Sequence, residues 1–66
     1  MYYVLRLHGP TSEHPEPIEA RDHRNAAELS RFNVPSTDLL VSNGPTTIRY
    51  HVDTLGRITE QSRYSA

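Results

Sequence analysis

The sequence predicts a two-layer α+β domain in which one helix packs on one face of a small antiparallel sheet. Three observations indicate this class: the C-terminal third holds three β-type runs separated by turn residues, the N-terminal residues alternate in character, and only one segment has helical spacing. A single short helix covers one face of such a sheet, so the other face stays open. We therefore expect one domain over residues 1–66, with its elements in the order ββαβββ.

The first strand is expected at residues 2–8, where two kinds of position alternate. Its uniformly apolar side is expected to face the core: Tyr3, Leu5 and Leu7. Its mixed side is expected to face outward: Tyr2, Val4, Arg6 and His8. Residues 9–17 contain three prolines and a glycine, which predicts a flexible loop. A short second strand over 17–21, at an edge of the sheet, would then turn Ile18 and Ala20 inward.

The helix is expected over residues 22–33. Asp22 and Asn25 are the two candidate N-caps, and Asn25 followed three residues later by Glu28 approximates a capping box. The residue before Pro35 is pushed out of the helical conformation, which ends the helix. An apolar stripe at spacings of three and four should pack on the sheet: Ala26, Leu29, Ser30 and Phe32.

Three strands are expected after the helix, at residues 39–42, 46–52 and 57–61, with turns at 43–45 and 53–56. The alternation of the middle strand turns Thr47, Arg49 and His51 to the open face. Residues 62–66 are expected to be a frayed C-terminal tail. The predicted core collects the inward positions of all elements: Tyr3, Leu5, Leu7, Ile18, Ala20, Ala26, Leu29, Phe32, Leu39, Val41, Ile48, Tyr50, Val52 and Ile58.

Composition argues against most catalytic and cofactor chemistry. The chain has no Cys, so neither a disulfide nor a thiolate zinc site is available, and the spacings of its four His match no common metal motif. No Ser stands in a nucleophile-elbow context, and the three Gly are isolated turn residues rather than a phosphate-binding loop. We therefore expect a protein that is not an enzyme and that uses no cofactor and no metal.

The expected open face suggests a binding surface. All seven basic residues are Arg, and Tyr and Arg are the residues that most often dominate binding energy at interfaces. The predicted contact residues are Tyr2, Arg6, His8, Arg49, His51 and Arg57. The alternative is an ordinary solvated sheet face with cross-strand polar pairs. A nucleic acid bound on the same face is a further alternative, although the net charge of -1 and the absence of an RRM signature do not favour it.

A resemblance makes the functional expectation more specific. The segment Pro17-Ile18-Glu19-Ala20, the segment 25–29 and the hairpin 50–58 resemble small inhibitors encoded by phages and mobile elements, which often combine one helix with a meander. The resemblance implies a stoichiometric inhibitor of a host nucleic-acid-processing or defence complex, such as an anti-CRISPR protein or a transcription inhibitor. It assigns no functional residue.

Location and assembly follow from simpler features. The apolar stretch near the N-terminus is shorter than the core of a signal peptide, and no apolar run of 18 residues exists. We expect a cytoplasmic protein, located in the host cytoplasm if a phage encodes it, with no membrane partner. The edges of the sheet leave self-association as a homodimer open.

Overall fold

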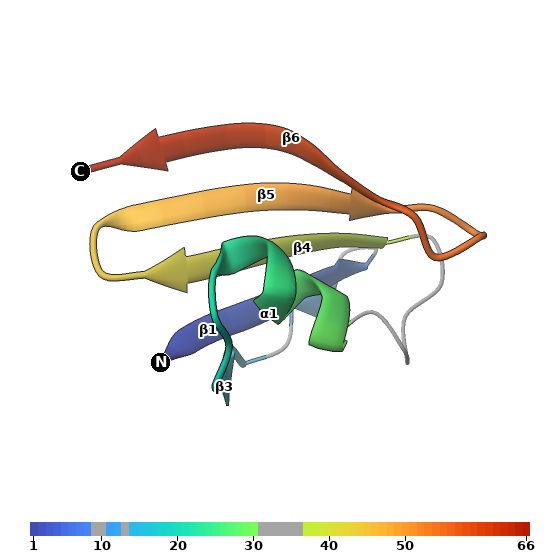
Figure 1. Ribbon diagram of the computed structural model, residues 1–66. Coiled ribbons are helices and arrows are strands. Elements are labelled where there is room, and N and C mark those ends of the chain that lie inside the picture. Colours follow the sequence, from blue (N-terminus) through green and yellow to red (C-terminus); the bar gives the residue numbers. More distant parts are fainter. Residues whose placement is uncertain (9–10, 13, 31–36) are drawn as a thin grey trace.

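The computed structural model describes residues 1–8, 11–12, 14–30 and 37–66. Its elements, shown in Figure 1, are β1 (Tyr2–His8), β2 (Thr11–Ser12), β3 (Glu16–Ile18), α1 (His23–Ser30), β4 (Thr37–Asn43), β5 (Thr46–Val52) and β6 (Ile58–Ser65). The predicted class is confirmed, because the described residues form an antiparallel sheet accompanied by one helix. The stretch expected to be a loop, 9–17, instead contributes β2 and the start of β3 to the sheet.

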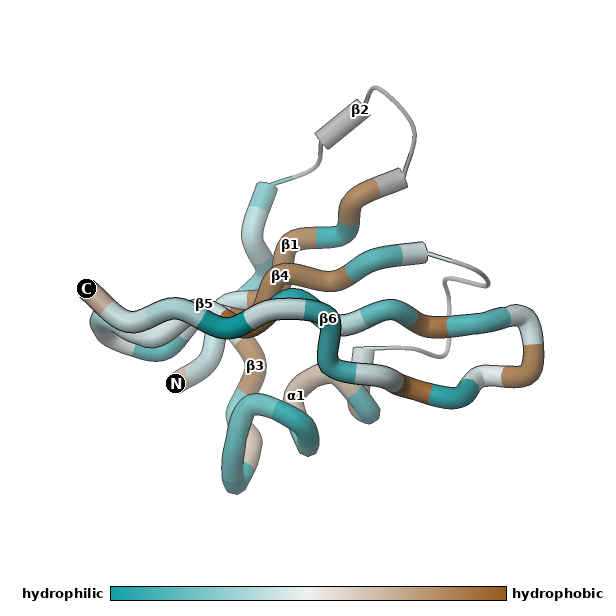
Figure 2. Tube along the Cα trace, turned by 90° about the horizontal axis from the view of Figure 1, so that it is seen from above, coloured by the Kyte–Doolittle hydropathy of each residue, from teal (hydrophilic) through white to brown (hydrophobic). Residues whose placement is uncertain are grey.

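All strand pairs among the described residues are antiparallel, and the strands follow the order β2-β1-β4-β5-β6, with β3 also pairing with β1. Figure 2 shows α1 and β3 on the same side of the sheet. The helix contacts β1 and β4. Within the described part of the chain, no helix or strand packs on the opposite side, so the two-layer arrangement leaves one face open.

The β4–β5 hairpin follows directly from its turn residues. Asn43 pairs with Thr46, so Gly44 and Pro45 form a two-residue turn. Gly44 has a φ of 59°, and a positive φ at the first central position suits the twist of a tight hairpin. Because the turn is so short, it fixes every cross-strand neighbour between β4 and β5.

The turn between β5 and β6 is organised by one carboxylate. Asp53 Oδ1 accepts hydrogen bonds from the backbone N–H groups of Leu55 and Arg57, both at 2.9 Å. Its Oδ2 accepts a third from Arg57 Nε at 2.9 Å. Gly56, with a φ of 80°, completes the turn in the left-handed region, where residues with a Cβ are strained.

The predicted frayed tail is wrong, because β6 continues to Ser65 and residues 62–65 all pair with β5. The strand contains one irregularity. Tyr50 pairs with Glu60 and Arg49 pairs with Ser62, which leaves Gln61 as an extra residue. Such a β-bulge shifts the alternation of the strand by one position.

The helix begins at the first of its two candidate caps. Asp22 Oδ1 accepts a hydrogen bond from the backbone N–H of Asn25 at 2.7 Å, which is the N-cap geometry. Asn25 Oδ1 in turn accepts one from the backbone N–H of Arg21 at 3.1 Å. Ala26, Ala27 and Ser30 are buried, whereas Leu29, expected in the core, is 49% exposed. The expected helical residues 31–33, with Phe32 among them, and Pro35 lie outside the described residues.

The inward positions predicted for the last three strands are confirmed, because all of them are buried in the core. Two more of the predicted positions, Ile18 and Ala20, are partly buried against it. The buried apolar residues are Val4, Ala26, Ala27, Leu39, Val41, Ile48, Tyr50, Val52 and Ile58. Most of them come from β4 and β5, whose alternation is unambiguous.

The predicted orientation of β1 is wrong. Val4, expected to face outward, is 2% exposed, whereas Tyr3, expected in the core, is 49% exposed. Tyr2 packs against the core, and its ring meets the ring of His23 at a centroid distance of 4.9 Å. By strand alternation Leu5 and Leu7 accompany Tyr3 on the open side. A charged residue can lie on the helix side because its aliphatic stem packs there while its guanidinium reaches a carboxylate, as Arg6 reaches Glu16 at 2.8 Å.

Among the described residues, no helix has both the length and the apolar character needed to cross a membrane.

Candidate functional site

The open face is the side of the sheet opposite α1. Residues directly opposite each other in an antiparallel pair share a face, so the strand registers define its members. These members are Tyr3, Leu5 and Leu7 on β1, Asp38, Leu40 and Ser42 on β4, Thr47, Arg49 and His51 on β5, and Thr59, Ser62 and Tyr64 on β6. The open face is apolar over β1 and becomes polar toward β6.

The apolar part of the open face is centred on two leucines. Leu5 on β1 lies directly opposite Leu40 on β4, and both are half-buried although no described helix or strand covers them. Tyr3 and Leu7 extend this apolar row along β1. Contiguous apolar side chains on an uncovered face are typical of an interaction surface, whereas isolated ones are ordinary.

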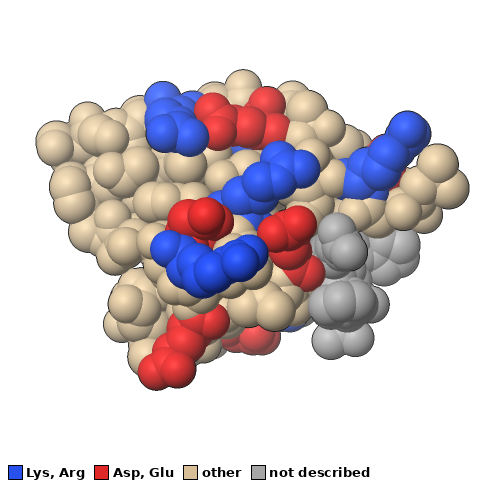
Figure 3. Space-filling view, in the orientation of Figure 1, with Lys and Arg blue, Asp and Glu red and all other residues tan. Residues whose placement is uncertain are grey.

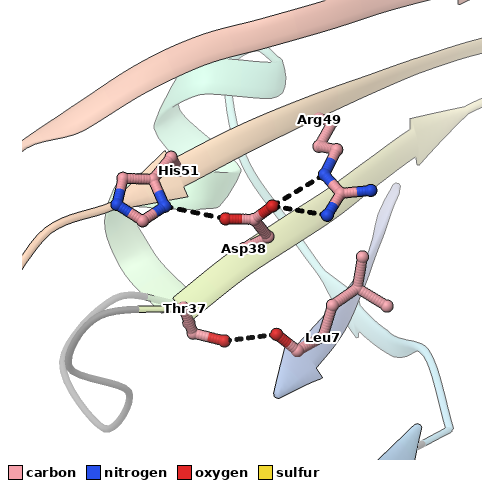
Figure 4. A network of polar contacts seen from close by, with 5 residues as sticks. All are labelled: Leu7, Thr37, Asp38, Arg49 and His51. Atoms are coloured by element: carbon pink, nitrogen blue, oxygen red, sulfur yellow. Dashed lines mark hydrogen bonds and ion pairs between the residues drawn. The ribbon is translucent and has the colours of Figure 1, made fainter. Parts of the chain in front are cut away.

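A charged network lies beside the apolar row. Asp38 Oδ2 accepts hydrogen bonds from Arg49 Nε at 2.7 Å and Nη2 at 2.6 Å, and Asp38 Oδ1 accepts one from His51 Nδ1 at 2.8 Å. Figure 4 shows the three side chains converging from two adjacent strands, with α1 behind them. Each of the two donors is held in place by one oxygen of the same carboxylate. The network therefore presents an oriented guanidinium and an oriented imidazole to solvent.

The start of β4 is also tied to the end of β1. Thr37 Oγ1 donates a hydrogen bond to the backbone carbonyl of Leu7 at 2.7 Å, as Figure 4 shows. Asp38 follows Thr37 and lies directly opposite Leu7. The carboxylate is thus anchored at the point where the apolar row meets the charged network.

The electrostatics of Asp38 favour its ionised form. Partial burial raises the pKa of its carboxyl, but the hydrogen bonds from His51 and Arg49 and their positive charge outweigh that effect and leave the pKa below its ordinary value. The carboxylate therefore stays charged through the neutral range and balances the charge of Arg49. The side chains of Arg49 and His51 are 45% and 43% exposed, so both donors of the network remain accessible to solvent.

Of the predicted contact residues whose side chains the structure describes, two are brought together on one surface. Arg49 and His51 meet on the open face through Asp38. Tyr2 and Arg6 lie on the helix side of β1, so the expectation that they share a surface with Arg49 is wrong. The reason is the reversed orientation of β1, which turns both residues toward α1 and β3.

The two remaining predicted residues lie at the ends of strands. His8 is the last residue of β1 and pairs with Thr11 of β2. Arg57 precedes β6, where its guanidinium pairs with Asp53 and its side chain is 74% exposed. A hollow beside this turn is lined by Arg24, Leu55, Gly56, Arg57, Ile58 and Thr59. Arg24 reaches the hollow from the helix and donates a hydrogen bond to the backbone carbonyl of Ile58 at 3.2 Å.

Asp38 and Leu40 belong to the candidate site but are not among the contact residues predicted from the sequence. The sequence does contain the information that places Asp38. Counting outward from a two-residue turn at Gly44 and Pro45 sets residue 38 opposite His51. The predicted strand began at residue 39, one position too late to include the carboxylate. Counting back one more residue would have identified the network.

On the helix side, charges of both signs are mixed. Figure 3 shows basic and acidic side chains next to each other over α1 and β6 rather than separated into patches. On both faces of the sheet and in the β5–β6 turn, four arginines in the described residues form ion pairs with carboxylates: Arg6 with Glu16, Arg49 with Asp38, Arg57 with Asp53, and Arg63 with Glu60. The described residues also contain no group of three or more His, Asp or Glu side chains able to hold a metal ion.

Comparison with protein-family models, with curated proteins and with solved structures found no match.

Proposed function

We propose that this protein is a non-enzymatic binding module that docks another protein on its open face. The observation that carries the proposal is the apolar row around Leu5 and Leu40, uncovered in the described structure and bordered by the oriented Arg49 and His51. An apolar centre beside fixed polar donors is the general composition of a protein interface. Tyr3, 49% exposed at the end of the row, adds an aromatic anchor.

The ion pairs favour a protein over a nucleic acid as partner. Arg49, the arginine of the open face, is neutralised by Asp38, and binding a phosphate would compete with that carboxylate. Affinity for nucleic acids depends on unneutralised cations, because phosphate contacts dominate it. The net charge of -1 adds no long-range attraction for a polyanion.

The most specific form of the proposal is an inhibitor or modulator of a nucleic-acid-processing or defence complex in a host cell. This form rests on the sequence resemblance to small phage-encoded inhibitors. A domain of 66 residues with an exposed recognition face is large enough to block a partner by occupying its surface.

The test combines capture of a partner with matched surface variants. Tagged wild-type protein is used to capture binding proteins from an extract of the source organism, and the captured protein is then purified for titration. Tyr3→Ser and Leu40→Ser remove apolar contact area from the open face. Leu29→Ser serves as the control, because Leu29 is as exposed as Tyr3 but lies on the helix.

We expect Tyr3→Ser and Leu40→Ser each to weaken binding by about tenfold or more, since losing a central interface contact costs more than ~1.4 kcal/mol. Leu29→Ser should leave the affinity unchanged. Titration of labelled single- and double-stranded oligonucleotides at moderate salt tests the alternative. Oligonucleotide binding that Tyr3→Ser abolishes would assign the face to nucleic acid instead, and equal effects of all three variants would refute a role for the open face.

A further inference from the structure

The two edges of the sheet differ sharply in how they are protected. The outer edge of β1 is covered by β2 and β3, which are only two and three residues long, and β3 contains Pro17. Short strands and proline are the usual protection against pairing with another chain. At the other edge, β6 is eight residues long, contains no proline and pairs only with β5 among the described strands.

The exposed edge carries one charge of each sign in a defined arrangement. Glu60 lies opposite Tyr50 and Arg63 lies opposite Ile48, so both belong to the helix side of the sheet. Residues three apart in a regular strand would point to opposite faces, and the extra residue Gln61 brings these two onto one face. Within one chain they form an ion pair, with Arg63 Nη2 2.9 Å from Glu60 Oε1.

We propose that two copies of this protein pair through β6 in an antiparallel, two-fold symmetric arrangement that joins their sheets into one. With the axis between Gln61 and Ser62, Glu60 of each copy lies opposite Arg63 of the other. On either side of the central Gln61 and Ser62, residues that face each other in this register also share a face of the sheet. Thr59 lies opposite Tyr64 on the open side, and Ile58 lies opposite Ser65 on the helix side.

Because of the bulge at Gln61, this register sets residues of the same face opposite each other. Without Gln61, an axis between two residues would set positions from opposite faces against each other. Charges on an edge strand repel or misalign most other strands, but this edge is complementary to itself. A symmetric interface of this kind closes on two copies and does not propagate into a fibre, because each copy has used its one long free edge.

The pairing has a consequence for the open face. In the two-fold arrangement both helices lie on one side of the joined sheet, and both open faces lie on the other. The dimer therefore presents two copies of the apolar row and its charged network on one continuous surface. A dimeric or repetitive partner could engage both copies at once.

The test is a charge exchange followed by measurement of mass in solution. Sedimentation equilibrium over a range of concentrations should give dimer for the wild type. Glu60→Arg and Arg63→Glu, each alone, place like charges opposite each other and should shift the mass to that of a monomer at the same concentration. The two variants mixed in equal amounts should recover the dimer, because each supplies the charge that the other lacks, and the double exchange within one chain should recover it as well.

Two matched variants control for net charge. Glu19→Arg and Arg21→Glu make the same charge changes at exposed positions away from β6 and should remain dimeric. Thermal unfolding of every variant establishes that the monomers are folded. A wild type that stays monomeric at all concentrations, or a dimer that either single exchange leaves intact, would overturn the proposal. Failure of the mixed variants to associate would also overturn it.

Discussion

Val4 on β1 lies directly opposite Val41 on β4, and both side chains are buried on the helix side of the sheet. This pair fixes the orientation of β1, because the positions on either side of Val4 must then point the other way. Tyr3 and Leu5 consequently lie on the open face. The candidate binding surface exists only because of this orientation.

The first prediction tests the orientation of β1 by stability. Val4→Ala removes two methyl groups from a position that is 2% exposed and should lower the free energy of unfolding by about 2 kcal/mol. Leu5→Ala removes more atoms but from a half-buried position, and it should cost about half as much. Urea denaturation of the two variants compares them. A larger loss for Leu5→Ala would place Leu5, not Val4, in the core.

The second prediction concerns the contribution of Asp38 to stability at low pH. Because the pKa of Asp38 is lowered in the folded state, its stabilising contribution is complete above the ordinary carboxyl value and is lost as the pH falls through the lowered one. Asp38→Asn should cost about 1 kcal/mol at neutral pH. The difference in unfolding free energy between wild type and variant should shrink as the pH falls from about 5 to 2. The pKa values of Asp53 and Glu60 are also lowered, but both residues are present in wild type and variant, so their effects on the difference cancel. A difference in unfolding free energy that stays constant with pH would show that Asp38 does not form the charged network.

The third prediction concerns the β4–β5 turn. Gly44 has a φ of 59°, and an added Cβ would meet no atom within 4 Å, so only backbone strain opposes a substitution. Gly44→Ala should lower the unfolding free energy by about 1 kcal/mol. Gly44→Asn should cost less, because Asn tolerates the left-handed region better than Ala. Equal effects of the two variants would show that something other than φ decides the stability of this turn.

The fourth prediction concerns the helix cap. Asp22 accepts the hydrogen bond from the backbone N–H of Asn25, and Asp22→Ala should lower the unfolding free energy by about 1 kcal/mol. Asp22→Ser, which can restore the cap, should recover most of the loss. Thermal unfolding followed by circular dichroism measures both. Similar losses for Ala and Ser would indicate that the carboxylate acts through its charge rather than as a cap.

The sequence predicts the orientation of a strand when the residues on one side are apolar and those on the other are polar. On β5 the contrast is complete, because Ile48, Tyr50 and Val52 alternate with Thr47, Arg49 and His51, and the predicted orientation is confirmed. The predicted positions of the two hairpin turns are also confirmed, since glycine at a left-handed position is a local requirement of each turn. These features depend only on neighbouring residues.

The orientation of β1 could not be obtained in the same way. Both of its sides carry apolar residues, and the side with more of them, Tyr3, Leu5 and Leu7, turned out to be the open one. The orientation of β1 depends on contacts with residues that are distant in the sequence. Tyr2 packs on His23, Val4 lies opposite Val41, and Arg6 forms a hydrogen bond with a carboxylate on β3. For the same reason, two of the contact residues predicted on β1 are wrong: the prediction names Tyr2 and Arg6, whereas Tyr3 and Leu5 lie on the open face.

The most direct test of the central claim follows the leucine methyl signals by NMR while the purified binding partner is added. We predict that the methyl resonances of Leu5, Leu7 and Leu40 shift or broaden first, because these side chains form the apolar row of the open face. The methyl resonances of Leu29, exposed on α1, should stay in place. Changes confined to Leu29 and its neighbours on α1, with the open-face leucines unaffected, would contradict the account.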